Sequence, residues 1–169
     1  ENRVGLLIAG GPERAYKKIA PIFKKLLDDQ LYCGPSGQGA AMKVLINYLC
    51  CLQRCAIAET LRVGIRSGVK GDILFDALQR SAADSRQLRN RGERMYKRRF
   101  AKPVSTVTVL HKDIKLGMLL AKRSGSIAPL GDASLPFYEE ALASGYGELD
   151  SAVVYKVYED KEKKKKKHR

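Results

Sequence analysis

The sequence of 169 residues is poor in the residues that build metal centres, disulfide frameworks and membrane spans. It has two histidines and four cysteines, and no two cysteines show C-x-x-C spacing, so we expect no metal site. No apolar run reaches the ~18 residues that a membrane span needs, and no signal-peptide pattern opens the sequence. These absences favour an intracellular protein with reduced thiols and no membrane partner. The expected location is the cytoplasm, and the mitochondrion is the alternative.

The charge balance is strongly basic, with a formal net charge of +14. The segment 156–169 holds eight of the Lys and Arg residues against three acids, and it ends in a low-complexity lysine run. Such a run repels itself, so we expect residues 159–169 to form a disordered, solvated tail. A second basic cluster, residues 86–99, has only Tyr96 as an aromatic and lacks the stacking pattern of a single-strand binder. A basic nucleic-acid-binding module therefore stays an unfavoured alternative.

The first 36 residues have the pattern of strand, helix and strand. Residues 4–9 form a continuous apolar run that suits a buried strand, and residues 30–33 form a second short one. Two strands do not make a stable sheet alone. We therefore interpret residues 1–36 as the edge of a larger α/β sheet, and the abrupt start at Glu1 as the sign of a longer protein.

Helical periodicity follows over residues 37–158. The first predicted helix carries only four charged residues, so we expect it to be buried on all sides. Glycines and capping residues separate the elements. The predicted helices cover residues 39–65, 71–80, 85–97, 106–123, 134–144 and 150–158. The pattern indicates a mainly α fold, a helical bundle preceded by a strand-helix-strand piece.

The glycines of residues 37–42, G-Q-G-A-A-M, follow a predicted strand and open a helix, as a dinucleotide-binding fingerprint does. The third fingerprint position is Met42, whose bulk would spoil the close helix–strand packing that Gly or Ala allows. We interpret these glycines as a flexible connection between sheet and bundle, with at most a minor role near a ligand.

Lys43 lies in the first turns of the long apolar helix, where the helix dipole disfavours a cation. Burial and dipole would both lower the pKa of this lysine, as a general acid/base near neutral pH requires. Asn47 follows four residues later on the same face, so the two side chains could hold one substrate oxygen. Physical reasoning alone slightly favours the alternative, in which Lys43 extends to solvent and Asn47 caps a neighbour.

The pair Lys112-Asp113 lies near the start of another apolar helix. The ordinary role of Asp113 is to interact favourably with the helix dipole. Lys112 could instead face a phosphate or a ribose. The residues of this pair alone leave both interpretations open.

One signature resembles a known family. Residues 34–39 read G-P-S-G-Q-G and are followed by Lys43 and Asn47. This pattern resembles the G-x-x-G-x-G-x-x-x-K-x-x-x-N signature of the β-hydroxyacid dehydrogenases. Members of that family include 3-hydroxyisobutyrate dehydrogenase, tartronate semialdehyde reductase and glyoxylate reductase. Further matches appear in the right order at Phe100, Lys112-Asp113 and residues 145–152. The resemblance covers residues 4–158.

The resemblance implies an NAD- or NADP-dependent oxidoreductase that interconverts a small β-hydroxyacid and its semialdehyde or keto form. Lys43 would be the acid/base and Asn47 would orient it, with Gly39, Asn47 and Asp113 at the substrate and Lys112 and Phe100 at the cofactor. Residues 37–158 would form a helical substrate domain, similar to the C-terminal domain of 6-phosphogluconate dehydrogenase, that builds a homodimer or tetramer.

Residues 1–36 would be the end of a Rossmann domain whose other parts are absent, so we expect the 169-residue chain alone to be inactive. An alternative is a non-catalytic helical dimerisation or partner-binding domain that remained after loss of the Rossmann half.

Overall fold

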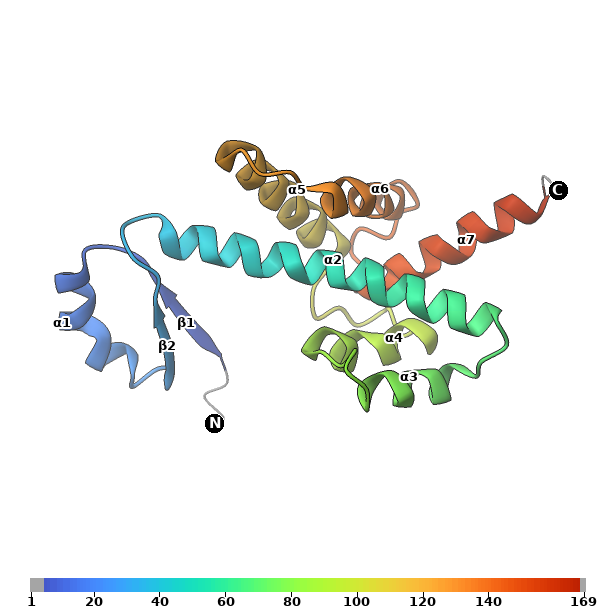
Figure 1. Cartoon of the computed structure of the whole chain (residues 1–169), viewed down its shortest axis with the longest axis horizontal. Helices are drawn as coiled ribbons and strands as arrows, with labels where there is room; N and C mark the ends of the chain where they lie inside the picture. Colours follow the sequence, from blue (N-terminus) through green and yellow to red (C-terminus); the bar gives the residue numbers. More distant parts are fainter. Residues whose placement is uncertain (1–4, 168–169) are drawn as a thin grey trace. The chain divides into compact units, whose positions relative to one another are not determined.

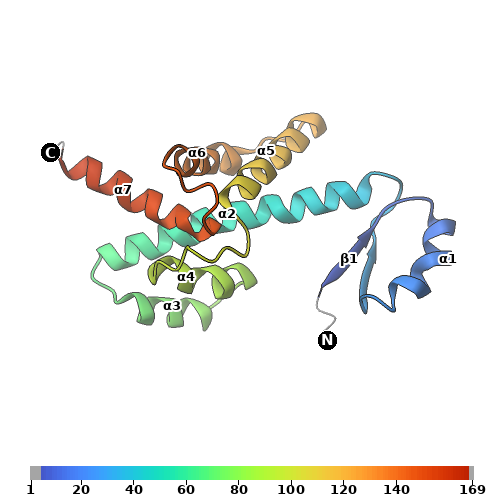
Figure 2. The same cartoon turned by 180° about the vertical axis from the view of Figure 1, so that it is seen from behind.

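The computed structural model of the chain describes residues 5–167 (Figures 1 and 2). They divide into two compact units that meet inside one long helix, after Ile46. The first unit contains β1 (Leu6–Ala9), α1 (Glu13–Phe23), β2 (Asp29–Tyr32) and the start of α2 (Gln38–Arg66). The second contains the rest of α2, then α3 (Gly71–Gln79), the π-helical turn η1 (Leu88–Gly92), α4 (Glu93–Tyr96), α5 (Val107–Ser124), α6 (Pro129–Ala143), the 3-10 turn η2 (Ser151–Val153) and α7 (Val154–Lys167).

The first unit is the strand-helix-strand piece that the sequence predicts. Strands β1 and β2 pair in parallel, with Leu6 opposite Asp29 and Ala9 opposite Tyr32, and α1 connects them. The ring of Tyr16 on α1 stacks on Tyr32 with 4.9 Å between centroids. A parallel pair needs such a crossover because its two strands run in the same direction.

The start of α2 packs tightly against the end of β1. A Cβ atom added to Gly10 would lie 2.6 Å from the Gly39 nitrogen, and one added to Gly39 would lie 2.9 Å from the Gly10 nitrogen. Backbones approach this closely only where both residues lack a side chain. The interpretation of these glycines as a flexible connection was therefore wrong, because Gly39 is a packing position in the first turn of a helix.

The second unit is a helical bundle in which α2 runs between the α5–α6 pair and the α3–α4 pair (Figures 1 and 2). The fully buried Tyr138 of α6 donates its hydroxyl hydrogen to the Cys51 carbonyl at 2.8 Å. Burial of α2 on all sides was a wrong expectation, since Leu49 and Val63 are exposed in the single chain. One face of α2 supplies the core, with the buried residues Cys51, Arg54, Cys55, Ala58 and Leu61.

A disordered tail was expected for residues 159–169, but α7 continues as a helix to Lys167. Arg62 of α2 contacts Glu159 at 2.7 Å and Glu162 at 2.6 Å. Lys161 and Lys164 both pair with Glu140 of α6. The acids of α7 thus bind α2 and two of its lysines bind α6, which the lysine composition alone did not indicate. Residues 168–169 of the predicted tail lie outside the described residues.

By length and composition alone, α2 could cross a membrane. The absence of a long uninterrupted apolar run in the sequence did not indicate this. The core helix of a soluble protein passes the same test. Five residues of α2 are buried in the helical bundle, and the helix carries Arg54, Glu59 and Arg62 in its second half. We therefore describe α2 as the core helix of the bundle.

Candidate active site

Lys43 is in the second turn of α2 and its side chain is exposed. The expectation of a buried lysine was wrong. Within the described part of the chain, Lys43 forms no hydrogen bond or ion pair, and the first turn of α2 contains no acid. An exposed amine without an intrachain partner is available to a ligand at the start of a helix.

Asn47, one turn after Lys43, is held by a buried carboxylate of α5. Its side-chain Nδ2 donates a hydrogen bond of 2.7 Å to Oδ2 of Asp113, which is 6% exposed. Because a carboxylate only accepts, this contact requires the amide nitrogen of Asn47 to face Asp113. The Oδ1 atom of Asn47 is left as an acceptor for a ligand or for a neighbouring N–H group. Asp113 therefore positions Asn47, a role that the sequence alone did not indicate.

Lys112 lies beside this pair. Its Nζ is 3.3 Å from Oδ1 of Asp113, and its side chain is 65% exposed. Helix α5 begins with Thr106, whose hydroxyl accepts a hydrogen bond from the Val109 nitrogen. This N-cap sets the start of the helix and thereby the direction of Lys112 and Asp113. Asp113 neutralises Lys112 in part, and the exposed ammonium remains free to meet an anionic group in solvent.

Two glycines that sequence reasoning missed allow Tyr48 of α2 to pack closely against α5 and α6. Gly117 follows Asp113 by one turn, and a Cβ added to it would lie 2.3 Å from the ring of Tyr48, the neighbour of Asn47. A Cβ on Gly131 of α6 would come equally close to the Tyr48 hydroxyl. The sequence shows a small residue, Gly117, one turn after Asp113. It does not show that Tyr48 is the residue that packs against it.

The carboxyl ends of β1 and β2 form a glycine-lined edge in the first unit. Gly34 and Gly37 have φ values of +107° and +94°, which favour glycine, and the Gly11 nitrogen donates to the Gly34 carbonyl at 2.9 Å. Ligands of parallel α/β sheets bind outside the carboxyl ends of the strands. In the first turn of α2, the Gln38 nitrogen donates to the Pro35 carbonyl at 3.1 Å. The N-terminus of a helix can in general receive an oxygen atom of a ligand.

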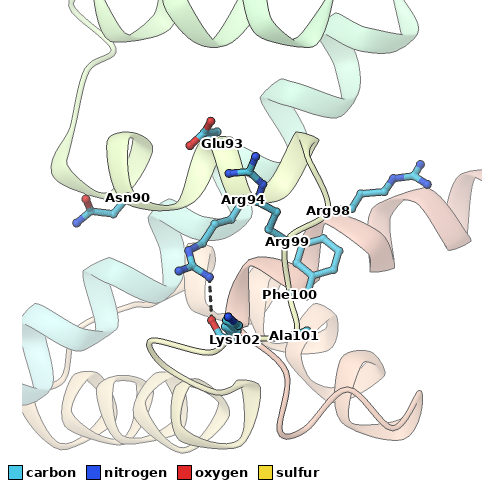
Figure 3. A pocket seen from close by; sticks show the side chains of 8 residues that line it. All are labelled: Asn90, Glu93, Arg94, Arg98, Arg99, Phe100, Ala101 and Lys102. Atoms are coloured by element: carbon cyan, nitrogen blue, oxygen red, sulfur yellow. Dashed lines mark hydrogen bonds between the residues drawn. The ribbon is translucent and has the colours of Figure 1, made fainter.

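Phe100 is not part of the Asn47–Asp113 cluster. Its side chain is 9% exposed and belongs to the helical core, where it also lines a separate cavity formed by residues 90–102 (Figure 3). Neither Asn47, Lys112 nor Asp113 lines that cavity. The structure thus brings Asn47, Asp113 and Lys112 together but does not join Phe100 to them.

The two buried thiols, those of Cys51 and Cys55, contribute no reactive group to this site. All four cysteines are free, and burial raises the pKa of Cys51 to about 12 and that of Cys55 to about 11. Such thiols stay protonated at neutral pH and are poor nucleophiles. In the described residues no three His, Cys, Asp or Glu side chains gather as a metal-ligand set.

The family model described as "NAD-binding of NADP-dependent 3-hydroxyisobutyrate dehydrogenase" matches residues 37–158. The chain belongs to this family of NAD(P)-dependent hydroxyacid dehydrogenases, which confirms the resemblance found in the sequence.

Individual relatives agree with the family assignment. The NAD-dependent L-serine dehydrogenase of Pseudomonas aeruginosa is 27% identical over 163 residues, which cover 90% of this chain and 53% of that protein. Glyoxylate/succinic semialdehyde reductase 1 of Arabidopsis thaliana is 28% identical with the same coverage. The crystal structure of 3-hydroxyisobutyrate dehydrogenase from Salmonella typhimurium matches with a TM-score of 0.81 at 25% identity, over 89% of this chain and 53% of that one. The chain spans about half the length of the curated relatives it matches.

Proposed function

We propose that this chain is the helical half of an oxidoreductase that interconverts a small β-hydroxyacid and its semialdehyde or keto form, with NAD or NADP as cofactor and Lys43 as the acid/base. The observation that carries the proposal is the pairing along α2: an exposed, unpartnered Lys43 lies one turn before Asn47, whose amide is fixed by the buried Asp113. Membership of the family supplies the reaction class.

In the direction of oxidation, Lys43 Nζ would take the proton from the substrate hydroxyl as the carbonyl forms. In the reverse direction the resulting ammonium would return this proton to the oxygen. Asn47 Oδ1, which the contact with Asp113 leaves available, would accept an N–H of Lys43 or the substrate hydroxyl hydrogen and keep the two groups in line. A base that transfers the proton and a neighbour that only positions it should differ in their effects on turnover.

Two features of the chain, one in each unit, would serve the cofactor. The glycine-lined edge with Gly34 and Gly37 lets a flat ring approach the backbone closely, and Lys112 can meet a phosphate or ribose oxygen. The sequence has no G-x-G-x-x-G loop for the pyrophosphate. When bound, the nicotinamide accepts hydride from the carbon that bears the hydroxyl.

The test substitutes Lys43 in the whole gene product, or in this chain fused to a relative's dinucleotide-binding domain if the gene product ends with these residues. Lys43→Ala should lower kcat by ~10²- to 10⁴-fold and leave cofactor affinity nearly unchanged, as expected for loss of a general acid/base. Lys43→Arg should not restore turnover, because guanidinium keeps its proton near neutral pH. Asn47→Ala should cost less and affect both kcat and KM.

The matched control is Lys18→Ala, which removes an exposed lysine of α1 and should leave kcat unchanged. Wild-type turnover in Lys43→Arg would show that Lys43 acts only as a charge or as a structural residue. The acid/base assignment would then be wrong even within the correct family.

A further inference from the structure

A cavity of about 470 Å³ lies in the second unit, apart from the Asn47–Asp113 cluster. All of its lining residues come from one short segment, the end of η1, α4 and the loop after it (Figure 3). Four of them are cationic and one is acidic: Arg94, Arg98, Arg99, Lys102 and Glu93. Phe100 and Ala101 add apolar surface to the wall.

The acids near this cavity pair with only part of its cations. Glu93 pairs with Lys97, which is outside the lining, and Arg98 turns away from the other cations to pair with Glu159 (Figure 3). Arg99 and Lys102 have no carboxylate within 4.0 Å in the described part of the chain. Both side chains are exposed, so they meet solvent and any solute in the cavity.

The excess of positive charge continues behind the cavity wall. The fully buried Asp150 is shared by two guanidinium groups, Arg91 at 3.2 Å and Arg94 at 3.6 Å. Arg91 is itself buried, and its Nε has no hydrogen-bond partner in the described residues. One carboxylate therefore faces two arginines that cannot lose their protons. One carboxylate for two guanidinium groups leaves a net positive charge in this region, and an anion in the cavity that Arg94 lines would offset this charge.

The donors of the cavity are held in place. Nη1 of Arg94 donates to the Lys102 carbonyl at 2.9 Å, which fixes the loop against α4 and directs Arg94 toward Lys102 (Figure 3). Guanidinium and ammonium groups match the oxygens of a phosphate. The volume exceeds that of phosphate alone and lies in the range of small-molecule sites. The phenyl ring of Phe100 offers an apolar surface to an organic part of the ligand.

We propose that this cavity binds a small organic phosphate, a phosphate monoester with an apolar or cyclic body. Arg94 and Lys102 would hold the phosphate, and Arg99, whose guanidinium is drawn on the side of Glu93, would add positive charge to the wall (Figure 3). Phe100 and Ala101 would contact the body. A small molecule is favoured over a nucleic-acid strand because the lining offers a single aromatic ring, that of Phe100. One ring cannot serve as a platform on which successive bases stack.

Calorimetric titration of the 169-residue chain at constant ionic strength tests this site, with inorganic phosphate and phenyl phosphate as probes. Phenyl phosphate should bind several-fold more tightly than inorganic phosphate. The double variant Arg99→Gln/Lys102→Gln should weaken phenyl phosphate binding by about tenfold or more, since it removes a charge-assisted donor and a second positive charge of the wall. The double variant Lys115→Gln/Arg123→Gln removes the same charge from exposed positions of α5 and should leave binding unchanged.

Ala101→Asp provides an independent variant at an exposed lining position, where an added carboxylate should abolish binding while the helical circular dichroism is retained. Equal losses in both double variants would show a general charge effect and overturn the proposal. Phosphate binding as tight as phenyl phosphate binding would overturn the role of Phe100 and Ala101 and with it the ligand class. Tighter, strongly salt-dependent binding of a twelve-nucleotide oligothymidylate that is lost in Arg99→Gln/Lys102→Gln would assign the cavity to nucleic acid instead.

Discussion

Replacing Gly117 with alanine would place a methyl group too close to the Cβ and ring atoms of Tyr48. The added Cβ atom would lie 2.3 Å from both Cγ and Cδ2 of Tyr48 and 2.6 Å from its Cβ. These atoms are at the root of the side chain, so a rotation about χ2 cannot move all of them away. Relief requires α5 to shift away from α2, and this shift would lengthen the contact between Asn47, the neighbour of Tyr48, and Asp113, one turn before Gly117.

Two opposing effects determine the result of Gly117→Ala. Alanine in a helix interior is favoured over glycine by ~1 kcal/mol, which stabilises the variant. Overpacking a close helix contact costs ~1–3 kcal/mol and sometimes more, and a clash with backbone-proximal atoms belongs to the upper end. We therefore expect a net loss of about 2 kcal/mol in the free energy of unfolding, measured by urea denaturation followed by circular dichroism.

A double-mutant cycle with Tyr48→Ala isolates the contact. Without the ring, the methyl group meets empty space, and Gly117→Ala should become neutral or stabilising by up to ~1 kcal/mol. The coupling energy between the two positions should then be about 2–3 kcal/mol, well above the ~0.5 kcal/mol seen for independent sites. A stabilising Gly117→Ala in the wild-type background, or a coupling near zero, would refute the close approach of α2 and α5.

Further outcomes concern the isolated chain. It should show no dehydrogenase activity and no tight NADH or NADPH binding, because the pyrophosphate has no glycine loop to receive it, and micromolar binding by calorimetry would contradict this. It should dimerise through the helical unit, where Leu49 and Val63 of α2 are exposed, and a monomer by sedimentation at high micromolar concentration would count against this. The hydrogen bond from Lys161 lowers the pKa of Glu140 below its ordinary 4.5, so this stabilisation of α7 is present above pH 4.5 and is lost as the pH falls through the lowered value. Carboxyl NMR of Glu140 should show the lowered pKa, and Lys161→Met should raise it.

The sequence predicted the elements of the fold because their determinants are local. The spacing of apolar residues indicated the helices, and the apolar run of β1 with the glycines after it indicated a strand at a sheet edge. The signature containing Lys43 and Asn47 indicated the family, which the match of residues 37–158 confirmed. Each of these signals lies within a few residues along the chain, so no knowledge of packing was needed.

Contacts between distant segments were decided only by the tertiary structure. Asn47 and Asp113 are 66 residues apart, and the sequence left Asp113 between a role at its own helix dipole and a role at the substrate, without indicating its hydrogen bond with Asn47. Helix α7 is bound by Arg62, which lies 97 and 100 residues before its partners Glu159 and Glu162. The free energy of an ion pair or a glycine contact depends on a partner that folding brings close, and a periodicity pattern carries no record of that partner.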